Sequence, residues 1–252
     1  MEIETAKQYF RQQVVVEHYA HAANAVGLWV SEEKIFTRLF KQEDSIIELG
    51  CGAGRIAIGL WELGYKHLMG VDYSREMVKE ARRINKVLEY GISFQYGDAT
   101  KLGFDEATFD GAIFGFNGLL MIPQRENRRR ALAEIKRVIK PGGWFVFTGH
   151  DREVHGNKKL WRDQQKLWNR SNQHPDLEMF GDLFHDMPEG GQMYIHSATR
   201  AEILEDLASV GLRHETDVLR SNLAPEPARV RQFSDDTRFW VVQRPLSDTD
   251  PE

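Results

Sequence analysis

A glycine-rich loop is the part of this sequence best suited to chemistry. The heptapeptide Glu48-Leu49-Gly50-Cys51-Gly52-Ala53-Gly54 follows a short apolar run and precedes residues with helical periodicity. Glycines let a backbone turn sharply and come close to a ligand, and the N-terminus of the following helix favours a phosphate or a carboxylate. The loop therefore predicts a ligand that resembles a nucleotide.

Two carboxylates follow the next two apolar runs of the sequence. Asp72 ends the first of these runs and could accept hydrogen bonds from ribose hydroxyls, as in adenosine-containing cofactors generally. Asp98, followed by Ala99, could accept a hydrogen bond from an adenine amino group. The dinucleotide fingerprint G-x-G-x-x-G needs a third glycine where this chain has Arg55, so NAD is disfavoured.

These residues need elements that hold them in place, and residues 45–149 supply such elements. Short apolar runs alternate there with helical spacing, which indicates a parallel sheet covered by helices on both faces. Helices are expected after Gly54, after Ser74 as N-cap, and up to Ile139, where residues 141–143 (Pro-Gly-Gly) end the last one. The expected strands are residues 45–49, 68–71, 92–96, 109–116 and 144–148.

The flanking segments complete the expected organisation. Residues 5–40 have a helical pattern, and Thr199 with Glu202 has the form of a capping box before another helix. Two further strands are expected at residues 213–219 and 238–243. The prediction is an N-terminal helical cap (1–44), a core (45–149 and 199–244), a lid or substrate insertion of aromatic-rich helical or loop pieces (150–198), and a frayed tail (245–252).

Four motifs in order carry a family resemblance. IIELGCGAGR (46–55), GVDYSREM (70–77), YGDAT (96–100) and IKPGGWFVF (139–147) together resemble the class I S-adenosylmethionine-dependent methyltransferases, most closely the small-molecule members with a helical N-terminal cap. The resemblance implies a Rossmann-like, seven-stranded, mostly parallel sheet with helices on both faces and an antiparallel last strand. Where DNA and glutamine-amide methyltransferases carry N/D-P-P-Y/F, this chain reads Phe116-Asn117-Gly118-Leu119, which disfavours those substrates.

The same resemblance implies the cofactor and its contacts. S-adenosylmethionine is expected as methyl donor and S-adenosylhomocysteine as product. The glycines of the loop would hold the methionine moiety, Asp72 the ribose, and Asp98 with Ala99 the adenine. The expected cofactor-binding residues are Glu48, Gly50, Cys51, Gly52, Gly54, Arg55, Asp72, Tyr73, Met77, Asp98, Ala99 and Phe114.

The catalytic residue is less well defined by the sequence. Methyl transfer mainly requires an acceptor aligned with the donor, and a general base helps when the acceptor loses a proton. The candidates are His150 and Asp151 after the fifth strand, and His18 and Tyr19 in the cap. No metal is expected, since the spacing of His150, His155 and His185 matches no compact ligand motif. Five aromatic residues could line an acceptor pocket or pack in the core, namely Trp29, Trp161, Trp168, Phe180 and Phe184.

Composition limits the remaining possibilities. The 252 residues are 41% apolar and 28% charged with a net charge of −5, which is typical of a globular protein and disfavours nucleic acid as a partner. The basic run at residues 128–130 is expected to be a solvated helix face. We expect a cytoplasmic protein outside the membrane on three grounds. The chain has a single cysteine, its first residues lack the basic start and apolar run of a secretory signal, and it has no long uncharged run.

The sequence therefore predicts a methyltransferase that acts on a small molecule, with the cap and the insertion forming the acceptor pocket. A protein or tRNA acceptor and a non-catalytic S-adenosylmethionine-binding protein stay open as alternatives.

Overall fold

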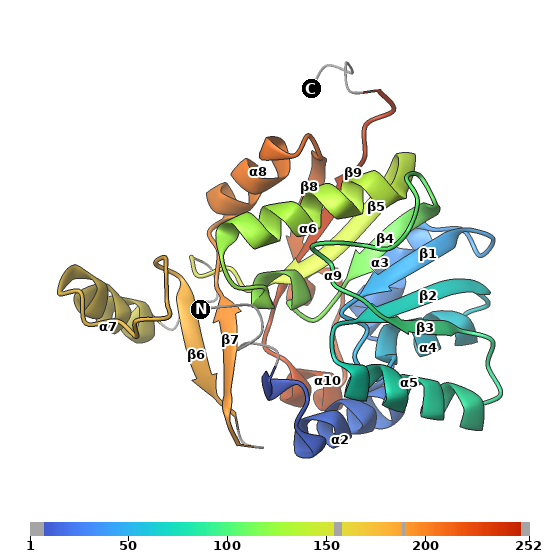
Figure 1. Cartoon of the computed structure of the whole chain (residues 1–252), viewed down its shortest axis with the longest axis horizontal. Coiled ribbons are helices and arrows are strands. Elements are labelled where there is room, and N and C mark those ends of the chain that lie inside the picture. Colours follow the sequence, from blue (N-terminus) through green and yellow to red (C-terminus); the bar gives the residue numbers. More distant parts are fainter. Residues whose placement is uncertain (1–7, 154–157, 188–189, 248–252) are drawn as a thin grey trace.

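A seven-stranded sheet forms the centre of the computed structural model, which describes residues 8–153, 158–187 and 190–247 (Figure 1). Its strand order is β3-β2-β1-β4-β5-β9-β8. Strands β1 to β5 run parallel, and β9 is antiparallel to both of its neighbours, β5 and β8. The expected α/β fold is thus confirmed. The strands are β1 (Ser45–Leu49), β2 (His67–Asp72), β3 (Ser93–Tyr96), β4 (Phe109–Phe114), β5 (Ile139–Gly149), β8 (Arg213–Leu219) and β9 (Arg238–Gln243).

Helices cover both faces of the sheet because successive side chains of each strand point to opposite sides. In β1, Ile46 packs in a cluster with Ile84, whereas Ile47 packs in a second cluster with Ile135 and Leu207. Each central strand is therefore apolar on consecutive positions, as a strand buried on both faces should be. One face is covered by α4 (Arg55–Glu62) and α5 (Arg75–Val87), and the other by α6 (Arg125–Val138) and α8 (Arg200–Ser209).

Two boundaries near the middle of the chain differ from the expectation. Helix α6 ends at Val138, and β5 already begins at Ile139, so residues 141–143 lie inside the strand rather than at a helix end. Phe109 of β4 pairs with Ile139 and Gly111 with Trp144, so the extra residues of this register shift lie in β5 and include the two glycines. Strand β4 ends at Phe114 because Phe116 and Asn117 have φ angles of +48° and +61°, which do not fit a β ladder.

The cap and the segment before β9 form a helical layer at one end of the sheet. The cap comprises α2 (Gln13–His21), the π-helical turn η1 (Ala22–Val26) and α3 (Val30–Leu39). Two short helices, α9 (Arg220–Leu223) and α10 (Ala228–Phe233), lie between β8 and β9, and no sequence pattern predicted them. Helix α10 packs on η1, beside α2 (Figure 1).

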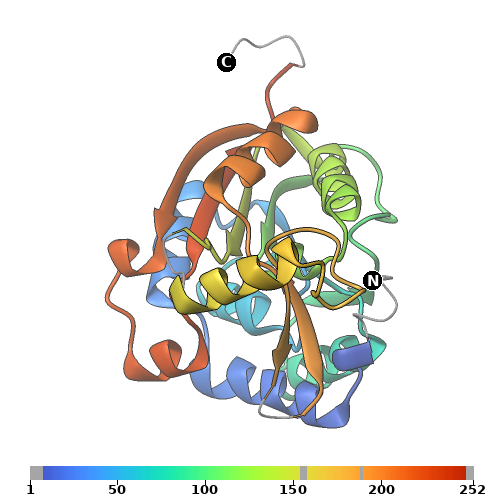
Figure 2. The ribbon, with the colours of Figure 1, turned by 90° about the vertical axis from the view of Figure 1, so that its left-hand side faces the viewer.

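The insertion contains one helix and a β-hairpin that the sequence did not reveal. Helix α7 (Lys158–Asn169) projects from the body and has no buried residue (Figures 1 and 2). Strands β6 (Asp182–Asp186) and β7 (Gln192–His196) pair antiparallel, with Phe184 opposite Tyr194. The hairpin packs on the start of the cap, where Met193 lies in a buried cluster with Tyr9 and Val15. The expectation of helical or loop pieces alone was therefore wrong.

A buried polar network fixes the base of this hairpin to the core. Asp182 accepts hydrogen bonds from the Tyr194 hydroxyl (2.7 Å) and from Nδ1 of His196 (2.8 Å), and the His196 Nε2 atom lies 3.5 Å from Glu202 in α8. Arg152 donates to the same Glu202 carboxylate. Arg128 is also buried, at 2% exposure, and donates to the Ile122 carbonyl, so the expectation that this part of the basic run is solvated was wrong.

The two carboxylates of this network are expected to make the fold sensitive to acid. Burial alone would raise the pKa values of both carboxyl groups. Hydrogen bonds from His196 and Tyr194 instead lower the pKa of Asp182 to about 2. Hydrogen bonds from His196 and Arg152 lower the pKa of Glu202 to about 2. Unfolded carboxyls titrate near pH ~4. Each ionised carboxylate therefore contributes on the order of 2 kcal/mol to the free energy of unfolding. This contribution is complete above about pH 5 and is lost as the pH falls toward 2.

Urea unfolding at pH 5.5, 4 and 3 measures this loss. The wild type should lose more stability over this range than Asp182→Asn, which is less stable throughout but has one titrating group fewer. Equal losses in the two proteins would contradict the role assigned to Asp182.

Candidate functional site

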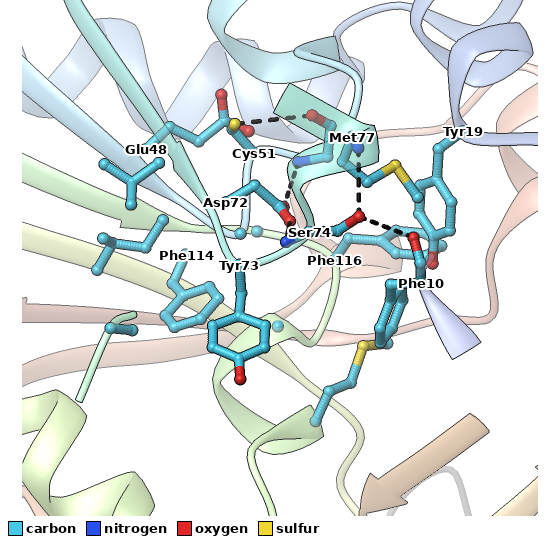
Figure 3. Close-up of a pocket in the computed structure, with 18 of the residues that line it drawn as sticks. Phe10, Tyr19, Glu48, Cys51, Asp72, Tyr73, Ser74, Met77, Phe114 and Phe116 are labelled. Carbon is cyan, nitrogen blue, oxygen red and sulfur yellow. Dashed lines mark hydrogen bonds between the residues drawn. The ribbon is translucent and has the colours of Figure 1, made fainter. Parts of the chain in front are cut away.

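A cavity opens at the carboxyl ends of β1, β2 and β4, where the sheet brings three sequence-distant loops together (Figure 3). Of the residues expected to bind a cofactor, only Gly54 is absent from its lining. The expected residues that line it are Glu48, Gly50, Cys51, Gly52, Arg55, Asp72, Tyr73, Met77, Asp98, Ala99 and Phe114.

The glycine loop needs glycine for two different reasons. Gly52 has a φ of +52°, and a Cβ atom there would meet only the Tyr19 ring at 3.8 Å, so the loop backbone faces the cavity at this point. Gly54 has a φ of +93°, and a Cβ atom would lie 2.9 Å from Phe94 in the core. Gly52 therefore belongs to the binding surface, whereas Gly54 lets α4 begin close to the sheet.

Cys51 lies between these glycines as a buried residue of the lining. Burial raises the pKa of its thiol well above its ordinary value. Since the thiolate is the nucleophilic form, Cys51 serves as a small filler of the loop.

Asp72 connects the end of β2 to the glycine loop. One carboxylate oxygen accepts the Gly52 N–H and the other accepts the Ser74 N–H, both at 2.7 Å (Figure 3). Burial raises the pKa of Asp72 to about 6, against the lowering effect of these two hydrogen bonds. Because a carboxylate oxygen can accept more than one hydrogen bond, Asp72 shapes the loop and still presents acceptors to a ligand.

Glu48 and Arg55 hold the helix behind the loop. Glu48 accepts the Ala57 N–H at 2.9 Å, and burial raises its pKa to about 8, since this outweighs the nearby Arg55 charge. The Arg55 guanidinium makes two hydrogen bonds of 2.6 Å to Glu32 of α3, and it donates to the Gly27 carbonyl at 2.9 Å. Arg55 thus joins the glycine loop to the cap, a contact that sequence reasoning missed.

The segment after β3 forms another wall of the cavity. Gly97, Asp98, Ala99 and Thr100 all line it. One oxygen of Asp98 accepts the backbone N–H and the hydroxyl of Thr100, at 2.8 and 2.7 Å, which closes a tight turn. This turn fixes the orientation of the Asp98 carboxylate beside the cavity.

The remaining lining comes from the cap, the segment after β4 and α10. Tyr19 is the only one of the four catalytic candidates that lines the cavity. No described residue of 150–198 does so, and the expectation that the insertion contributes to the pocket is corrected for those residues. The residues of this part are Phe10, Tyr19, Ala22, Phe116, Gly118, Met121, Ile122, Pro123 and Phe233.

The other three catalytic candidates lie outside the lining. His18 stacks on Phe233, with ring centroids 5.4 Å apart. The Nε2 atom of His150 lies 3.2 Å from the side-chain amide of Asn117, and Asp151 is buried in an ion pair with Arg238 at 3.0 Å. His150 thus contacts a residue of the segment after β4 without reaching the lining itself.

The sequence allowed five aromatic residues either to line an acceptor pocket or to pack in the core. All five pack against other side chains. Trp29 is 1% exposed and lies between the guanidinium groups of Arg55 and Arg220, at 4.6 and 4.9 Å. The remaining four pack within the insertion, Trp161 and Trp168 against Phe180, and Phe184 against His174 and Tyr194.

The described residues lack both a cluster of metal-ligating side chains and a helix suited to crossing a membrane. They contain no group of three or more His, Cys, Asp or Glu side chains placed to hold a metal ion; His155, from the expected spacing, lies outside them. Within the same part of the chain, no helix has the length and apolar character needed to cross a membrane.

Several known proteins that the core of this chain resembles are named as methyltransferases. A family described as a methyltransferase domain matches residues 46–143. A demethylmenaquinone methyltransferase from Leptospira interrogans is 38% identical over 105 residues, which are 40% of this chain and 41% of that protein. A lysine and N-terminal methyltransferase from Danio rerio is 28% identical over 114 residues, which are 44% of this chain and 16% of that protein.

The chain thus spans less than half the length of these two curated relatives. Among solved structures, a SAM-dependent methyltransferase from Methanosarcina mazei superposes with a TM-score of 0.68 at 20% identity, covering 88% of this chain and all of that one. At this identity the structural likeness concerns the fold. The relatives differ in the acceptors that their names imply, whereas the domain that they share contains the glycine loop.

Proposed function

Residues 46–143 of this chain form a domain of the class I S-adenosylmethionine-dependent methyltransferase family, and we propose that the chain transfers a methyl group from S-adenosylmethionine to a small-molecule acceptor. The observation that supports this most directly is one continuous cavity that runs from the glycine loop to an apolar, largely aromatic wall.

The residues of the cavity fit this cofactor. The loop leaves space above Gly52 for the methionine moiety, and the Arg55 charge lies behind the same loop. Asp72 would hold the ribose through its carboxylate, and Asp98 with Ala99 would meet the adenine. Tyr73, Met77 and Phe114 supply the apolar contacts that a purine ring requires, and they complete the set of residues proposed for the cofactor.

Bound S-adenosylmethionine supplies a methyl group that its sulfonium centre has already activated. The task of this chain is therefore to orient the acceptor and to exclude water, for which alignment alone can lower a barrier by roughly 7–11 kcal/mol. Phe10, Phe116 and Phe233 exclude water from the outer part of the cavity. The Tyr19 hydroxyl would orient the acceptor and take part in moving its proton.

A small acceptor suits the lining better than a macromolecule. The residues of the cap, the segment after β4 and α10 that line the cavity carry no charge, and they come from three segments that close around it. The Leptospira interrogans relative is named for a quinone, which is not a macromolecule. The Danio rerio relative, named for lysine and N-terminal methylation, makes a protein acceptor the second candidate.

Two measurements test the proposal. Calorimetry should show that S-adenosylmethionine binds and that NADH does not. Production of S-adenosylhomocysteine, screened against a metabolite library, a peptide library and bulk tRNA, should rise only with a small molecule. Cofactor binding without product from any acceptor would indicate a non-catalytic binding protein, and tight NADH binding alone would contradict the family assignment for the cavity.

Tyr19→Phe tests the role of the hydroxyl. The variant keeps the ring that packs against Gly52 and Phe116 but removes one hydrogen-bonding group from the cavity. We expect kcat to fall about fivefold, since one hydrogen bond contributes about 1 kcal/mol, while the Kd for the cofactor stays within twofold. Glu17→Gln, an exposed substitution in the same helix, is the control; an equal fall in kcat for both variants would argue against a specific role of Tyr19.

A further inference from the structure

Four aromatic rings form a distinct wall in the outer part of the cavity. They come from four separate segments: Phe10 precedes α2, Tyr19 lies in α2, Phe116 follows β4, and Phe233 ends α10. Figure 3 shows Phe10, Tyr19 and Phe116 on the side of the cavity opposite Glu48 and Phe114. This wall therefore lies away from the part of the cavity attributed to the adenine and ribose.

The rings contact one another edge-on and in a tilted arrangement. Phe116 lies 5.9 Å from Tyr19 at an interplanar angle of 90°, and 5.1 Å from Phe233 at 32°. The Tyr19 ring in turn approaches Gly52 of the glycine loop. Phe116 and Phe233 both line the cavity and are only partly buried, so a planar ligand ring would meet aromatic partners there in the edge-on or offset arrangements that aromatic pairs favour.

A second layer keeps these rings in place. His18 stacks on Phe233 at an interplanar angle of 18°, and the fully buried Trp29 meets Phe116 edge-on at 6.0 Å. Trp29 is itself fixed between Arg55 and Arg220. Such support means that little side-chain freedom is lost when a ligand binds.

Phe116 also adopts a backbone conformation that is unfavourable for an aromatic residue. Its φ of +48° is followed by +61° at Asn117, and no glycine relieves either position. Residues held in this region destabilise the fold and persist where the surrounding structure requires them. Here the Asn117 N–H donates to the Thr148 hydroxyl at 3.0 Å, which anchors the turn that directs Phe116 into the cavity.

From these contacts, and resting on the proposed methyltransferase function, we infer that the acceptor is an uncharged planar aromatic compound held against Phe116 and Phe233, and that Phe233 determines the largest ring system accepted. The absence of charged side chains from this part of the lining disfavours phosphorylated or carboxylate acceptors, because a buried charge needs a partner. Phe233 is the wall residue on the short segment between β8 and β9, so its replacement changes the width of the site without altering the sheet.

Binding and turnover of a graded series of ligands test this inference. The probes are phenol, 1-naphthol and 1-hydroxypyrene, with cyclohexanol and hexylamine as non-aromatic controls, titrated into the protein saturated with S-adenosylhomocysteine. The wild type should bind 1-naphthol at least tenfold more tightly than cyclohexanol. Phe233→Ala should bind 1-naphthol about tenfold more weakly, as expected for the loss of a ring pair and its buried area, and should gain relative affinity for 1-hydroxypyrene.

Phe184→Ala, which removes a half-buried ring of the hairpin outside the lining, is the matched control and should leave all these affinities unchanged. Phe233→Leu and thermal unfolding of each variant separate a local effect from loss of the fold. Equal binding of aromatic and non-aromatic probes, or the same change for every probe in Phe233→Ala, would overturn the inference. Ring-selective binding without methyl transfer to any compound would instead leave the aromatic site standing and contradict the proposed function.

Discussion

Replacing Glu32 by alanine is expected to lower the free energy of unfolding by roughly 3–5 kcal/mol, the largest effect on stability that we predict. The Glu32 and Arg55 side chains are 1% and 9% exposed and form two hydrogen bonds of 2.6 Å. Without Glu32, the Arg55 guanidinium stays buried and, among the described residues, keeps the Gly27 carbonyl as a hydrogen-bond acceptor and the Trp29 ring as a cation–π partner. A buried charge left without its partner is far more costly than a missing surface pair.

Urea unfolding followed by circular dichroism measures this effect. Two further variants show whether the unpaired charge causes it. Glu80→Ala breaks the exposed Arg83–Glu80 pair of α5 and should change stability by less than about 1 kcal/mol. The double variant Glu32→Leu/Arg55→Met removes both charges and should recover much of the loss seen in Glu32→Ala. A double variant as unstable as Glu32→Ala would show that packing, and not the unpaired charge, accounts for the loss.

Asp72→Asn is expected to weaken cofactor binding by about 10²- to 10³-fold, the largest functional effect that we predict. The Asp72 carboxylate accepts both the Gly52 and the Ser74 N–H, and an amide at this position would direct its own N–H₂ toward one of these donors. The variant therefore disturbs the glycine loop as well as the proposed ribose contact. Hydrogen bonds to a charged group contribute about 1.5–3 kcal/mol each, which gives this range.

The pH dependence of binding identifies Asp72 as the responsible group. Since burial raises its pKa to about 6, the folded protein binds a proton at Asp72 as the pH falls below 6, and a protonated carboxyl offers fewer acceptors. Cofactor affinity measured by calorimetry should therefore fall between pH 7.5 and 5.5 in the wild type and stay flat in Asp72→Asn. Glu126→Gln, an exposed substitution on α6, is the control. A pH dependence retained in Asp72→Asn would assign it to another group.

The parts of the site that could be predicted from the sequence depend on local chemistry. A glycine with positive φ, a carboxylate at a strand end and an N-cap serine are dictated within a few residues, and Gly52, Asp72 and Ser74 lie as the motifs indicated. The strands β1, β8 and β9 also have the predicted limits, and β1 ends where its apolar run meets Gly50.

The parts that could not be predicted depend on contacts between distant segments. The Glu32–Arg55 pair forms only when the cap docks on α4, and nothing in either local sequence indicates it. Helix α10 has six residues, too few for a periodic pattern, so Phe233 gave no signal of its position in the cavity. The strands of the hairpin have five residues each and derive their stability from packing on the cap, which periodicity does not reveal.

The position of β9 in the sheet affects how the protein folds during its synthesis on the ribosome. This strand follows all the others along the chain, yet it lies between β5 and β8 and pairs with both. Until residues 238–243 have emerged, a nascent chain that has folded β1 to β5 presents the edge of β5 to its surroundings, and β8 has no neighbour. An open, apolar edge of this kind is a site for pairing with other chains. The sheet is therefore completed only when residues 238–243 are available, and the edge of β5 needs protection from other chains while residues 150–243 are being synthesised.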